Sequence, residues 1–518
     1  MNRPSRARTV LPVVALALSA CAHVTNTPLQ DFAPDPHSSY RFDPKPDRDT
    51  LVIVTLSGGG SRAAALAYGT LQMLGTMPGS GQGSLLDQVD IISSVSGGSV
   101  TAGWYALKGP AGLVPADETN ALWRFLYHDW TANLGWRGLN PVSLTKYAFT
   151  PYQRSDVLAD FFADNLFGQT TYRDVLQRYK ADAKQPYVIL NATDLGHEIG
   201  LTFTQGNFDF LCSDLNRYRL ADAVAASANF PLAFSAIGLQ NYSPCDAQRG
   251  EAWKKDGPAQ WISHYAQFDV PDRPEPNSFQ LTELRFARQA KSYIEPAPAD
   301  TFVHLLDGGL IDNLGVRSTL AIADNPARVP GLYLRLGRLR PQGYQNIRRV
   351  VYIVVNARKR DPASMDHREY PPMTGTTVAQ MINTQLDNSI LGDQDYLIAQ
   401  LEATANRQPL VPGAPAAAQP FLSGNDAAQA TFPVSETPHL RFYVAAVDFE
   451  LIPDPACRDR FWALATSWGL PPQQTTSLIN LAHVLLSRSK DLQGFYRDIG
   501  KTAPKQSDFT EVCRQIQM

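Results

Sequence analysis

A run of apolar residues that ends in a serine enclosed by small residues constrains the fold of this chain more than any other feature. The β-branched residues within 89–92 predict a buried strand, and residues 101–107 predict the first turns of a helix. A serine at so tight a strand-to-helix turn, here Ser96, is held at the edge of a sheet with its hydroxyl exposed. The N–H groups that follow, beginning with that of Gly97, point toward any negative charge formed there. We therefore predict a nucleophile elbow with Ser96 as its nucleophile.

The elbow departs from its usual form at one position. The usual pattern is Gly-x-Ser-x-Gly, and here Ser94 stands at the first glycine position while Gly98 keeps the second. Serine is the smallest polar replacement for glycine, so a sharp turn remains feasible. Because a small-x-Ser-x-Gly string on its own is more often only a turn, the assignment of Ser96 depends on the rest of the chain.

A glycine-rich loop lies upstream, between a predicted buried strand over 50–56 and an alanine-rich helix over 63–74. Consecutive glycines at such a junction, here Gly58, Gly59 and Gly60, let backbone N–H groups approach an anion without obstruction. The spacing matches neither Gly-x-Gly-x-x-Gly nor a P-loop with its Lys-Ser/Thr pair. The favoured anion is therefore the oxyanion of a tetrahedral intermediate rather than a phosphate.

An aspartate followed by two glycines marks a third site further downstream. The apolar run over 302–306 predicts a strand that ends in Asp307, directly before Gly308 and Gly309. An aspartate in this position lies at the end of a strand, where the glycines that follow let another loop approach its side chain. An Asp-Gly pair by itself is a common turn, so this site also depends on the others.

The three sites together resemble the patatin-like phospholipase family, the acyl hydrolases with a Ser-Asp dyad. That family has its oxyanion glycine loop first, its nucleophile elbow second and an Asp-Gly pair well downstream, which is the order found here. The segment 226–231 is similar to the family's Ala-Ser-x-x-x-Pro segment, and 191–194 lies where such proteins often carry a strand beside the site. The resemblance spans about residues 48–320, and its departures at Ser57 and Ser94 remove no reacting group.

The resemblance implies an α/β fold: a three-layer sandwich with a largely parallel central sheet flanked by helices and the site at the carboxyl ends of the strands. It implies that Asp307 accepts the Ser96 proton directly, with no histidine relay. The implied oxyanion donors are the N–H groups of Gly58, Gly59, Gly60 and Gly97, and the implied supporting residues are Arg62, Gly98 and Gly308. Arg62 has three interpretations: it orders the glycine loop, attracts an anionic head group, or is a surface charge at the start of a helix.

The predicted activity is hydrolysis of lipid acyl esters, of the phospholipase A or lysophospholipase kind, without a cofactor. Three alternatives stay open: hydrolysis of smaller esters by the same dyad, a Ser-His-Asp α/β-hydrolase, and an inactive lipoprotein that keeps the fold for binding. The Ser-His-Asp alternative needs His439 or His483 as a late histidine. His483 lies in an apolar helical run that favours a packed core position, and the alternative leaves Asp307 unexplained. The intact Ser96 and Asp307 argue against an inactive protein.

The N-terminus predicts export. Three arginines precede an apolar run over 10–18 that is too short to span a bilayer. The following Leu-Ser-Ala-Cys is similar to a bacterial lipobox, which predicts a signal peptide over 1–20 and lipidation of Cys21; an ordinary secretory signal is the alternative. Ala22, where an aspartate would indicate retention at the inner membrane, favours the periplasmic side of the outer membrane. The polar, proline-containing segment 21–47 is predicted to be a tether.

The cysteines agree with export. With Cys21 lipidated an even four remain, and in an oxidising compartment they predict two disulfides. Sequence proximity favours Cys212 with Cys245 and Cys457 with Cys513, while other pairings and buried free thiols stay open. No Cys-x-x-Cys or Cys/His spacing indicates a metal site.

Composition bounds the remaining possibilities. At 44% hydrophobic and 18% charged residues the chain can bury a large core, and removal of residues 1–20 leaves 43 basic against 49 acidic residues. That net charge of −6 gives no electrostatic footprint for nucleic acid.

We expect a catalytic domain over 48–360 with an insertion at about 240–300, and a C-terminal extension over 361–518 that either completes the sheet or caps it. The oligomeric state is not indicated.

Overall fold

The computed structural model describes residues 24, 26–33, 37–43, 45, 48–231, 233–255, 284, 288–320, 347–360, 374–405 and 441–516. An eight-stranded sheet forms the centre, in the order β5-β6-β3-β2-β1-β7-β8, with β4 paired to β3 beside this path. The strands are β1 (Thr50–Leu56), β2 (Val89–Val95), β3 (Tyr187–Asp194), β4 (Ile199–Thr202), β5 (Ile237–Gln240), β6 (Phe302–Asp307), β7 (Arg349–Asn356) and β8 (Arg441–Asp448).

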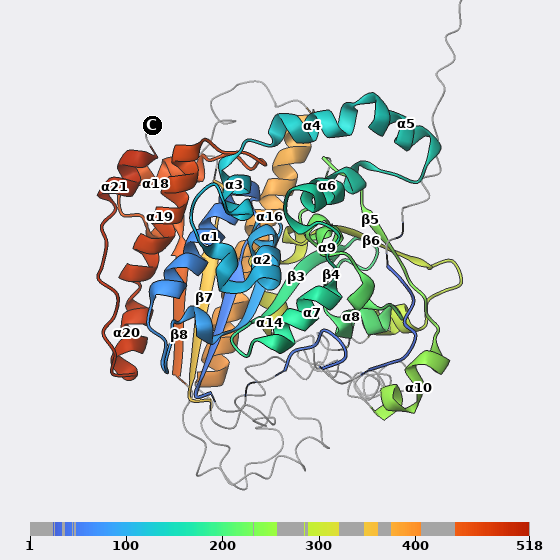
Figure 1. Cartoon of the computed structure of the whole chain (residues 1–518), viewed down its shortest axis with the longest axis horizontal. Coiled ribbons are helices and arrows are strands. Elements are labelled where there is room, and N and C mark those ends of the chain that lie inside the picture. The colour runs from blue at the N-terminus through green and yellow to red at the C-terminus, as the bar shows by residue number, and fades with distance from the viewer. Residues whose placement is uncertain are drawn as a thin grey trace, which may run out of the picture.

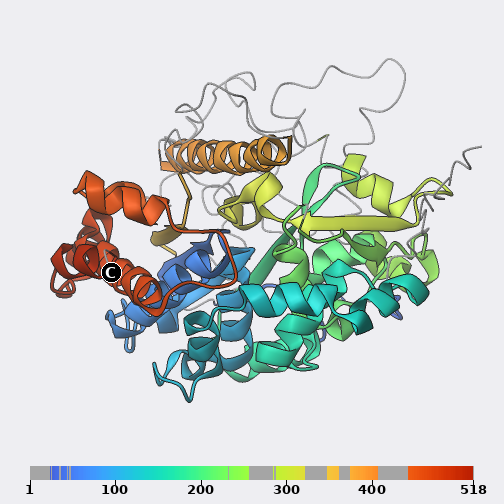
Figure 2. The same cartoon turned by 90° about the horizontal axis from the view of Figure 1, so that it is seen from above.

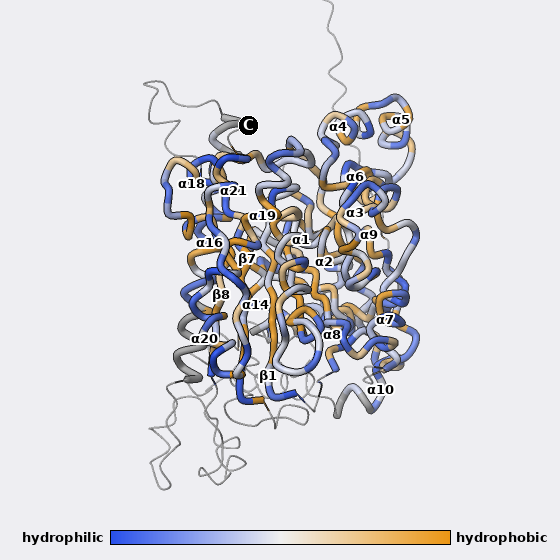
Figure 3. Tube along the Cα trace, turned by 60° about the vertical axis from the view of Figure 1, so that its left-hand side comes forward, coloured by the Kyte–Doolittle hydropathy of each residue, from blue (hydrophilic) through white to orange (hydrophobic). Residues whose placement is uncertain are grey.

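The middle of the sheet is parallel and its β5–β6 side is antiparallel. β3, β2, β1, β7 and β8 run parallel to one another, whereas β6 is antiparallel to β3 and β5 is antiparallel to β6. β1 is buried along its whole length and β7 along nearly all of it, as expected for strands covered on both faces. Figure 3 shows this apolar centre inside a more polar surface.

Helices cover both faces of the sheet and complete the sandwich. α16 lies on one side in Figure 2, together with α13 and α14, while α1 and α2 lie on the other. The helices, labelled in Figure 1 where there is room, are α1 (Gly60–Thr76), α2 (Gly97–Lys108), α3 (Ala121–Tyr127), α4 (Thr131–Leu139), α5 (Pro141–Phe149), α6 (Arg154–Phe162), α7 (Tyr172–Ala181), α8 (Gln205–Phe210), α9 (Leu220–Ser227), α10 (Asp246–Lys255), α13 (Gly309–Asp312), α14 (Val316–Leu320), α16 (Thr374–Ala405), α18 (Pro455–Trp462), α19 (Pro472–Arg488), α20 (Lys490–Asp498) and α21 (Thr510–Gln515). Short turns of other helix types are η1 (Leu86–Gln88), η2 (Gly109–Leu113), η3 (Ala163–Phe167), η4 (Leu215–Arg217) and η7 (Phe449–Leu451). The predicted α/β class is confirmed.

The C-terminal region is built into the sheet. β8 pairs with β7 over their full lengths, and α19 packs along α1. A disulfide between Cys457 and Cys513 ties α18 to α21. The sequence left open whether this region completes the sheet or caps it. The region contributes the edge strand β8 and therefore completes the sheet.

The segment expected to be a tether packs against the body from at least Asn26 onward, so that prediction is wrong for its described part. Tyr40 is fully buried, and Arg41 forms a buried ion pair with Asp209. Pro28 forms a β-bridge with Ser213. The segment is held because it carries apolar and aromatic side chains that the body can bury. Residues 1–20 and Cys21 lie outside the described residues.

The other predicted disulfide pair is also joined in the structure. Cys212 is bonded to Cys245, next to the packed N-terminal segment, where Leu29 lies in the same apolar cluster. The insertion expected at about 240–300 separates the paired strands β5 and β6, and most of its middle lies outside the described residues. No helix in the described part of the chain is both long enough and apolar enough to cross a membrane.

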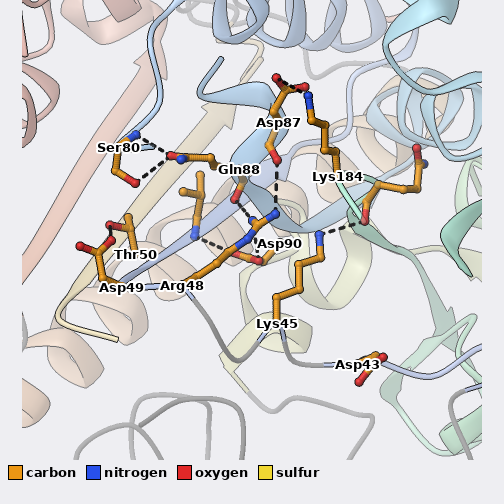
Figure 4. Close-up of polar contacts among 12 residues, drawn as sticks. Asp43, Lys45, Arg48, Asp49, Thr50, Ser80, Asp87, Gln88, Asp90 and Lys184 are labelled. Atoms are coloured by element: carbon orange, nitrogen blue, oxygen red, sulfur yellow. Dashed lines mark hydrogen bonds and ion pairs between the residues drawn. The ribbon is translucent and has the colours of Figure 1, made fainter. Parts of the chain in front are cut away.

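A buried carboxylate organises the amino-terminal edge of the sheet (Figure 4). Asp90, in β2, accepts the N–H of Val52 (2.9 Å) at the point where the β1–β2 register shifts, and it pairs with Arg48 (2.9 Å). Burial raises the pKa of Asp90 and nearby cations oppose the rise. Lys45, whose pKa burial lowers to about 8, donates to the Gln185 carbonyl. This network fixes the start of the two strands whose other ends form the site.

Candidate active site

Ser96 lies in the turn between β2 and α2 in a strained backbone conformation. Its φ of 51° and ψ of −119° are rarely adopted by residues with a side chain. The turn brings α2 against β1 and its loop, since a Cβ on Gly98 would lie 2.6 Å from the Leu56 carbonyl oxygen. Gly97 lies in the same way against the Gly60 carbonyl. The close approach requires glycine at both positions, and the chain here has the geometry expected of an elbow.

Ser94 takes the place of the usual first glycine without opening the turn. Its hydroxyl donates to the Ile189 carbonyl (3.1 Å) and lies 3.0 Å from the Ser99 hydroxyl. The added side chain is thus buried with its hydrogen bonds satisfied. This departure from the usual pattern leaves the backbone of the elbow intact.

A hydrogen-bond network behind the elbow fixes Ser96. The Ser96 N–H donates to the Ser227 hydroxyl (3.0 Å), which in turn donates to the Asn191 carbonyl (2.6 Å). The Asn191 side-chain amide donates to the Ser94 carbonyl (2.8 Å). Ser227 and Asn191 lie in the two segments that the sequence marked only by resemblance, and their positioning roles were not predicted.

Asp307 is delivered to the elbow by β6, whose last residue pairs with Ala192 of β3. The Asp307 N–H donates to the Asn229 carbonyl (3.0 Å), and the carboxylate accepts the Gly309 N–H (2.9 Å). Burial raises the pKa of Asp307 to about 6, while hydrogen bonds from Gly309 and from the Ser96 side chain oppose the rise. The carboxylate is therefore a stronger base than a solvated aspartate, and the Ser96 hydroxyl is its partner.

The glycine loop faces the elbow, but one of its three N–H groups is already used. Gly58 donates its N–H to the Asn313 carbonyl (3.1 Å), so this N–H, predicted to be an oxyanion donor, is already paired in the structure. The N–H groups of Gly59 and Gly60 have no acceptor among the residues that the structure describes, and both residues line the cavity described below. Gly59 and Gly60 are the donors of this loop that remain for an oxyanion, and Gly97 is not among the residues that line the cavity.

Arg62 orders the glycine loop from inside the protein. Arg62 is 2% exposed, and its guanidinium donates to the Ala357 carbonyl (2.8 Å), the Leu464 carbonyl and the Thr466 hydroxyl (3.2 Å). Burial lowers the pKa of Arg62 to about 10, which still leaves it charged at neutral pH. Of the three interpretations of Arg62, ordering of the loop fits the structure, and a surface charge does not.

The C-terminal loop that meets Arg62 also covers Gly60. Ser61 donates its N–H to the Ser467 carbonyl (2.9 Å), and a Cβ on Gly60, whose φ is +61°, would lie 2.5 Å from that same oxygen. Residues 464–468 therefore press against the start of α1. Nothing in the sequence connected this loop with the site, because it lies about four hundred residues downstream of the glycines.

Ser96 and Asp307 lie on the wall of one cavity of about 790 Å³, together with Gly58, Gly59, Gly60 and Arg62. Gly97, Gly98 and Gly308 are not among the residues that line it. Much of the lining is apolar or aromatic: Leu134, Leu139, Tyr147, Val157, Phe230, Phe234, Leu386, Ile390 and Trp468. Arg154, Arg358 and Lys359 add positive charge, and Arg358 pairs with Asp387 (3.2 Å). The cavity can hold a long apolar group beside an anionic one.

His483, one of the two histidines that the alternative triad could use, does not line this cavity. His483 is on α19, which packs against α1, and burial lowers its pKa; His439 lies outside the described residues. Among the residues that the structure describes, no three His, Cys, Asp or Glu side chains gather as a metal site. Ser96 therefore has a carboxylate, and no described imidazole, beside it.

Comparison with known proteins places these motifs in a family. The family model described as patatin-like phospholipase matches residues 54–320. No curated protein matches the sequence. Among solved structures, the chain is similar to human GIVD cytosolic phospholipase A2, with a TM-score of 0.40 at 14% identity over 88% of this chain and 64% of that chain.

The same human protein in complex with methyl gamma-linolenyl fluorophosphonate and terbium chloride gives a TM-score of 0.37 at 14% identity, over 87% of this chain and 60% of that chain. The chain therefore spans less than two thirds of the length of these structures, and neither bears on its activity. The family match itself contains the glycine loop, the elbow and Asp307. Because that match covers more than half of the sequence, the chain belongs to the patatin-like phospholipase family.

Proposed function

We propose that this protein hydrolyses lipid acyl esters through a Ser96–Asp307 dyad. One observation carries the proposal: Ser96 and the buried Asp307, whose pKa burial raises to about 6, meet on the wall of a largely apolar cavity beside the unused N–H groups of Gly59 and Gly60. A nucleophile, its base and an oxyanion site are the three parts that acyl transfer needs.

The first half of the reaction forms an acyl-enzyme. The Ser96 oxygen attacks the acyl carbonyl carbon while its proton passes to Asp307, and the carbonyl oxygen becomes an oxyanion held by Gly59 and Gly60. Loss of such a donor typically costs about 3–4 kcal/mol of transition-state stabilisation. The C–O bond to the alcohol then breaks, and the alcohol leaves with the proton from Asp307.

The second half returns the free enzyme. Water attacks the acyl carbon of the ester on Ser96 and gives a proton to Asp307. The C–O bond to Ser96 breaks, Ser96 takes the proton back, and the carboxylic acid departs. No histidine is needed in either half, because Asp307 serves as base and acid in turn.

The cavity favours a phospholipid over a neutral lipid as substrate. Apolar side chains line the space for an acyl chain, and Lys359, half-buried on the same wall, offers positive charge beside the Arg358–Asp387 pair. A phosphodiester is the anionic group that accompanies acyl chains in a membrane lipid. A phospholipase A or lysophospholipase activity fits this arrangement.

The test is release of fatty acid from phospholipids by the purified chain. We expect turnover of long-chain diacyl or monoacyl phospholipid, and a loss of at least about 10³-fold in Ser96→Ala and in Asp307→Asn. His483→Asn is the control, and it should keep most of the activity. Full activity in Ser96→Ala would refute the proposal, and a collapse in His483→Asn would favour the triad.

Hydrolysis of smaller esters is the second candidate, because the dyad itself does not select chain length. A series of p-nitrophenyl esters from acetyl to palmitoyl separates the two. A rise in kcat/KM with chain length supports lipid hydrolysis through the apolar cavity lining. A maximum at acetyl supports the small-ester activity.

We also propose that the protein is exported and held by lipidated Cys21 on the periplasmic side of the outer membrane. The lipobox at 18–21 supports this, and the two disulfides fit an oxidising compartment. Mass spectrometry of the N-terminal peptide from cells tests it. A diacylglyceryl group on Cys21 is expected, and an unmodified or uncleaved N-terminus would contradict the proposal.

A further inference from the structure

Exposed apolar side chains are concentrated on two consecutive helices, α4 and α5. In the described part of the chain eleven large apolar side chains are exposed, and five of them belong to these two nine-residue helices. Their exposed fractions range from 50% to 83%. The five are Trp136, Leu139, Val142, Leu144 and Phe149.

The same two helices form part of the cavity wall. Leu134 and Gly138 of α4 and Tyr147 of α5 line the cavity that holds Ser96 and Asp307. Figures 1 and 3 place α4 and α5 at the outer edge of the molecule, beyond α6. Leu139, one of the five exposed residues, lines the cavity as well, whereas the other four present apolar side chains to the outside and do not line it.

The charge of this segment has a single sign. Between Asp129 and Asp156 the sequence contains Arg137, Lys146 and Arg154 and no acidic residue, although the chain as a whole has a net charge of −3. Arg137 reaches Asp164 (2.7 Å) on the neighbouring η3. An apolar surface bordered by cations complements a layer of anionic phospholipid, whose headgroups attract the cations while its acyl region takes the apolar side chains.

We propose that α4 and α5 dock the protein onto an anionic phospholipid surface, so that the cavity opens directly at the lipid. This inference rests on the proposed function, because it takes the phospholipid at this surface to be the substrate that is hydrolysed. It is separate from the acyl anchor, because it concerns the folded domain itself. A second copy of this chain is the rival occupant of the surface.

Trp136 supplies a local probe of docking in the full chain. With Ser96→Ala as background, so that no lipid is consumed, we expect brominated phospholipids in phosphatidylcholine–phosphatidylglycerol vesicles to quench Trp136 fluorescence. Subtraction of the Trp136→Phe spectrum isolates this residue from the other tryptophans. Equal quenching with and without Trp136 would overturn the proposal. Because the assay needs no turnover, its result is independent of whether the proposed hydrolysis occurs.

Two matched leucines test the surface a second way. Leu144 on α5 and Leu391 on α16 are 50% and 48% exposed, and neither lines the cavity. Leu144→Glu is expected to reduce the vesicle-bound fraction by about tenfold and to leave turnover of a soluble ester unchanged, whereas Leu391→Glu changes neither. Equal vesicle binding by both variants would overturn the proposal. It would also be overturned if Leu144→Glu changed only the oligomeric state in sedimentation, from dimer to monomer, because a second copy of the chain would then be the occupant of this surface.

Discussion

Asp307 differs from an ordinary aspartate because the protein buries it beside Ser96. Desolvation raises its pKa to about 6, and the Gly309 N–H and the Ser96 side chain keep the rise moderate. At neutral pH the carboxylate is therefore still ionised, yet it is basic enough to accept a serine proton during attack. In the proposed mechanism, this balance at one residue is what lets the reaction proceed without histidine.

The balance predicts an acid limb in the pH–rate profile. We expect kcat/KM for a neutral soluble ester to fall about tenfold per pH unit below a pKa of about 6, because protonated Asp307 cannot act as a base. Initial rates between pH 4.5 and 8 measure it. A rate that stays flat down to pH 4.5 would exclude Asp307 as the base.

The same burial predicts a stability gain in Asp307→Asn. Below about pH 4 the Asp307 carboxyl is protonated in both the folded and the unfolded chain. As the pH rises toward 6, the carboxyl ionises freely only in the unfolded chain, so the free energy of unfolding decreases. The asparagine variant escapes this loss. We expect it to be more stable than the parent by up to about 3 kcal/mol at pH 8 and to match it below pH 4. Urea unfolding at both pH values checks this, and an equal difference at both would contradict it.

The sequence identified the two residues of the proposed dyad more readily than the contacts that hold them in place. Ser96 and Asp307 stand in local patterns of strand, small residue and turn, which a sequence displays directly. The Ser227 hydroxyl that accepts the Ser96 N–H lies 131 residues away, and the carbonyl that takes the Gly58 N–H belongs to Asn313. Such contacts depend on how strands are ordered in the sheet, and no local pattern contains that information.

Among the elements, the glycine loop depends most on distant parts of the chain. Its backbone follows β1, but Arg62 ties it to the residue after β7 and to the C-terminal loop. An oxyanion site needs its N–H groups fixed before the reaction begins. In the proposed mechanism Arg62 is therefore a positioning residue that acts through the loop and does not need to touch the substrate.

Replacement of Arg62 by methionine is expected to affect both stability and rate. Loss of the guanidinium leaves the Ala357 and Leu464 carbonyls buried without their donor, which costs about 2–4 kcal/mol. We expect kcat to fall at least about tenfold with little change in KM, since a loosened oxyanion site weakens only the transition state. Arg514→Met, at an exposed pair with Glu511, is the matched control. An Arg62→Met variant with lower stability and unchanged kcat would show that the residue is only structural.

At the scale of the whole molecule, the site is assembled from both ends of the chain. The family match stops at residue 320, yet β7, β8 and the 464–468 loop complete the sheet and brace the glycines. The α/β class was predicted from the resemblance of the sequence to the patatin-like phospholipase family. The sequence could not place the C-terminal region, because β8 joins the sheet only through its pairing with β7, far from it in sequence.

The C-terminal disulfide is therefore expected to matter for activity as well as for stability. Cys457–Cys513 closes a loop of 56 residues around the segment that carries 464–468. Replacing both cysteines by serine should lower stability by about 2–4 kcal/mol and make the activity fail at a lower temperature. Thermal unfolding and activity-loss curves of the two proteins measure this. Identical curves would contradict the bracing role.

The central claim is that Ser96 is a nucleophile activated by Asp307 alone. A fluorophosphonate ester, which phosphonylates activated serines, tests it through the rate of modification and the mass of the labelled peptide. We predict one adduct per chain, on the peptide that contains Ser96, with labelling slowed at least about 10²-fold by Asp307→Asn and unchanged by His483→Asn. Modification of another serine, or equal labelling rates in Asp307→Asn and the parent protein, would contradict the claim.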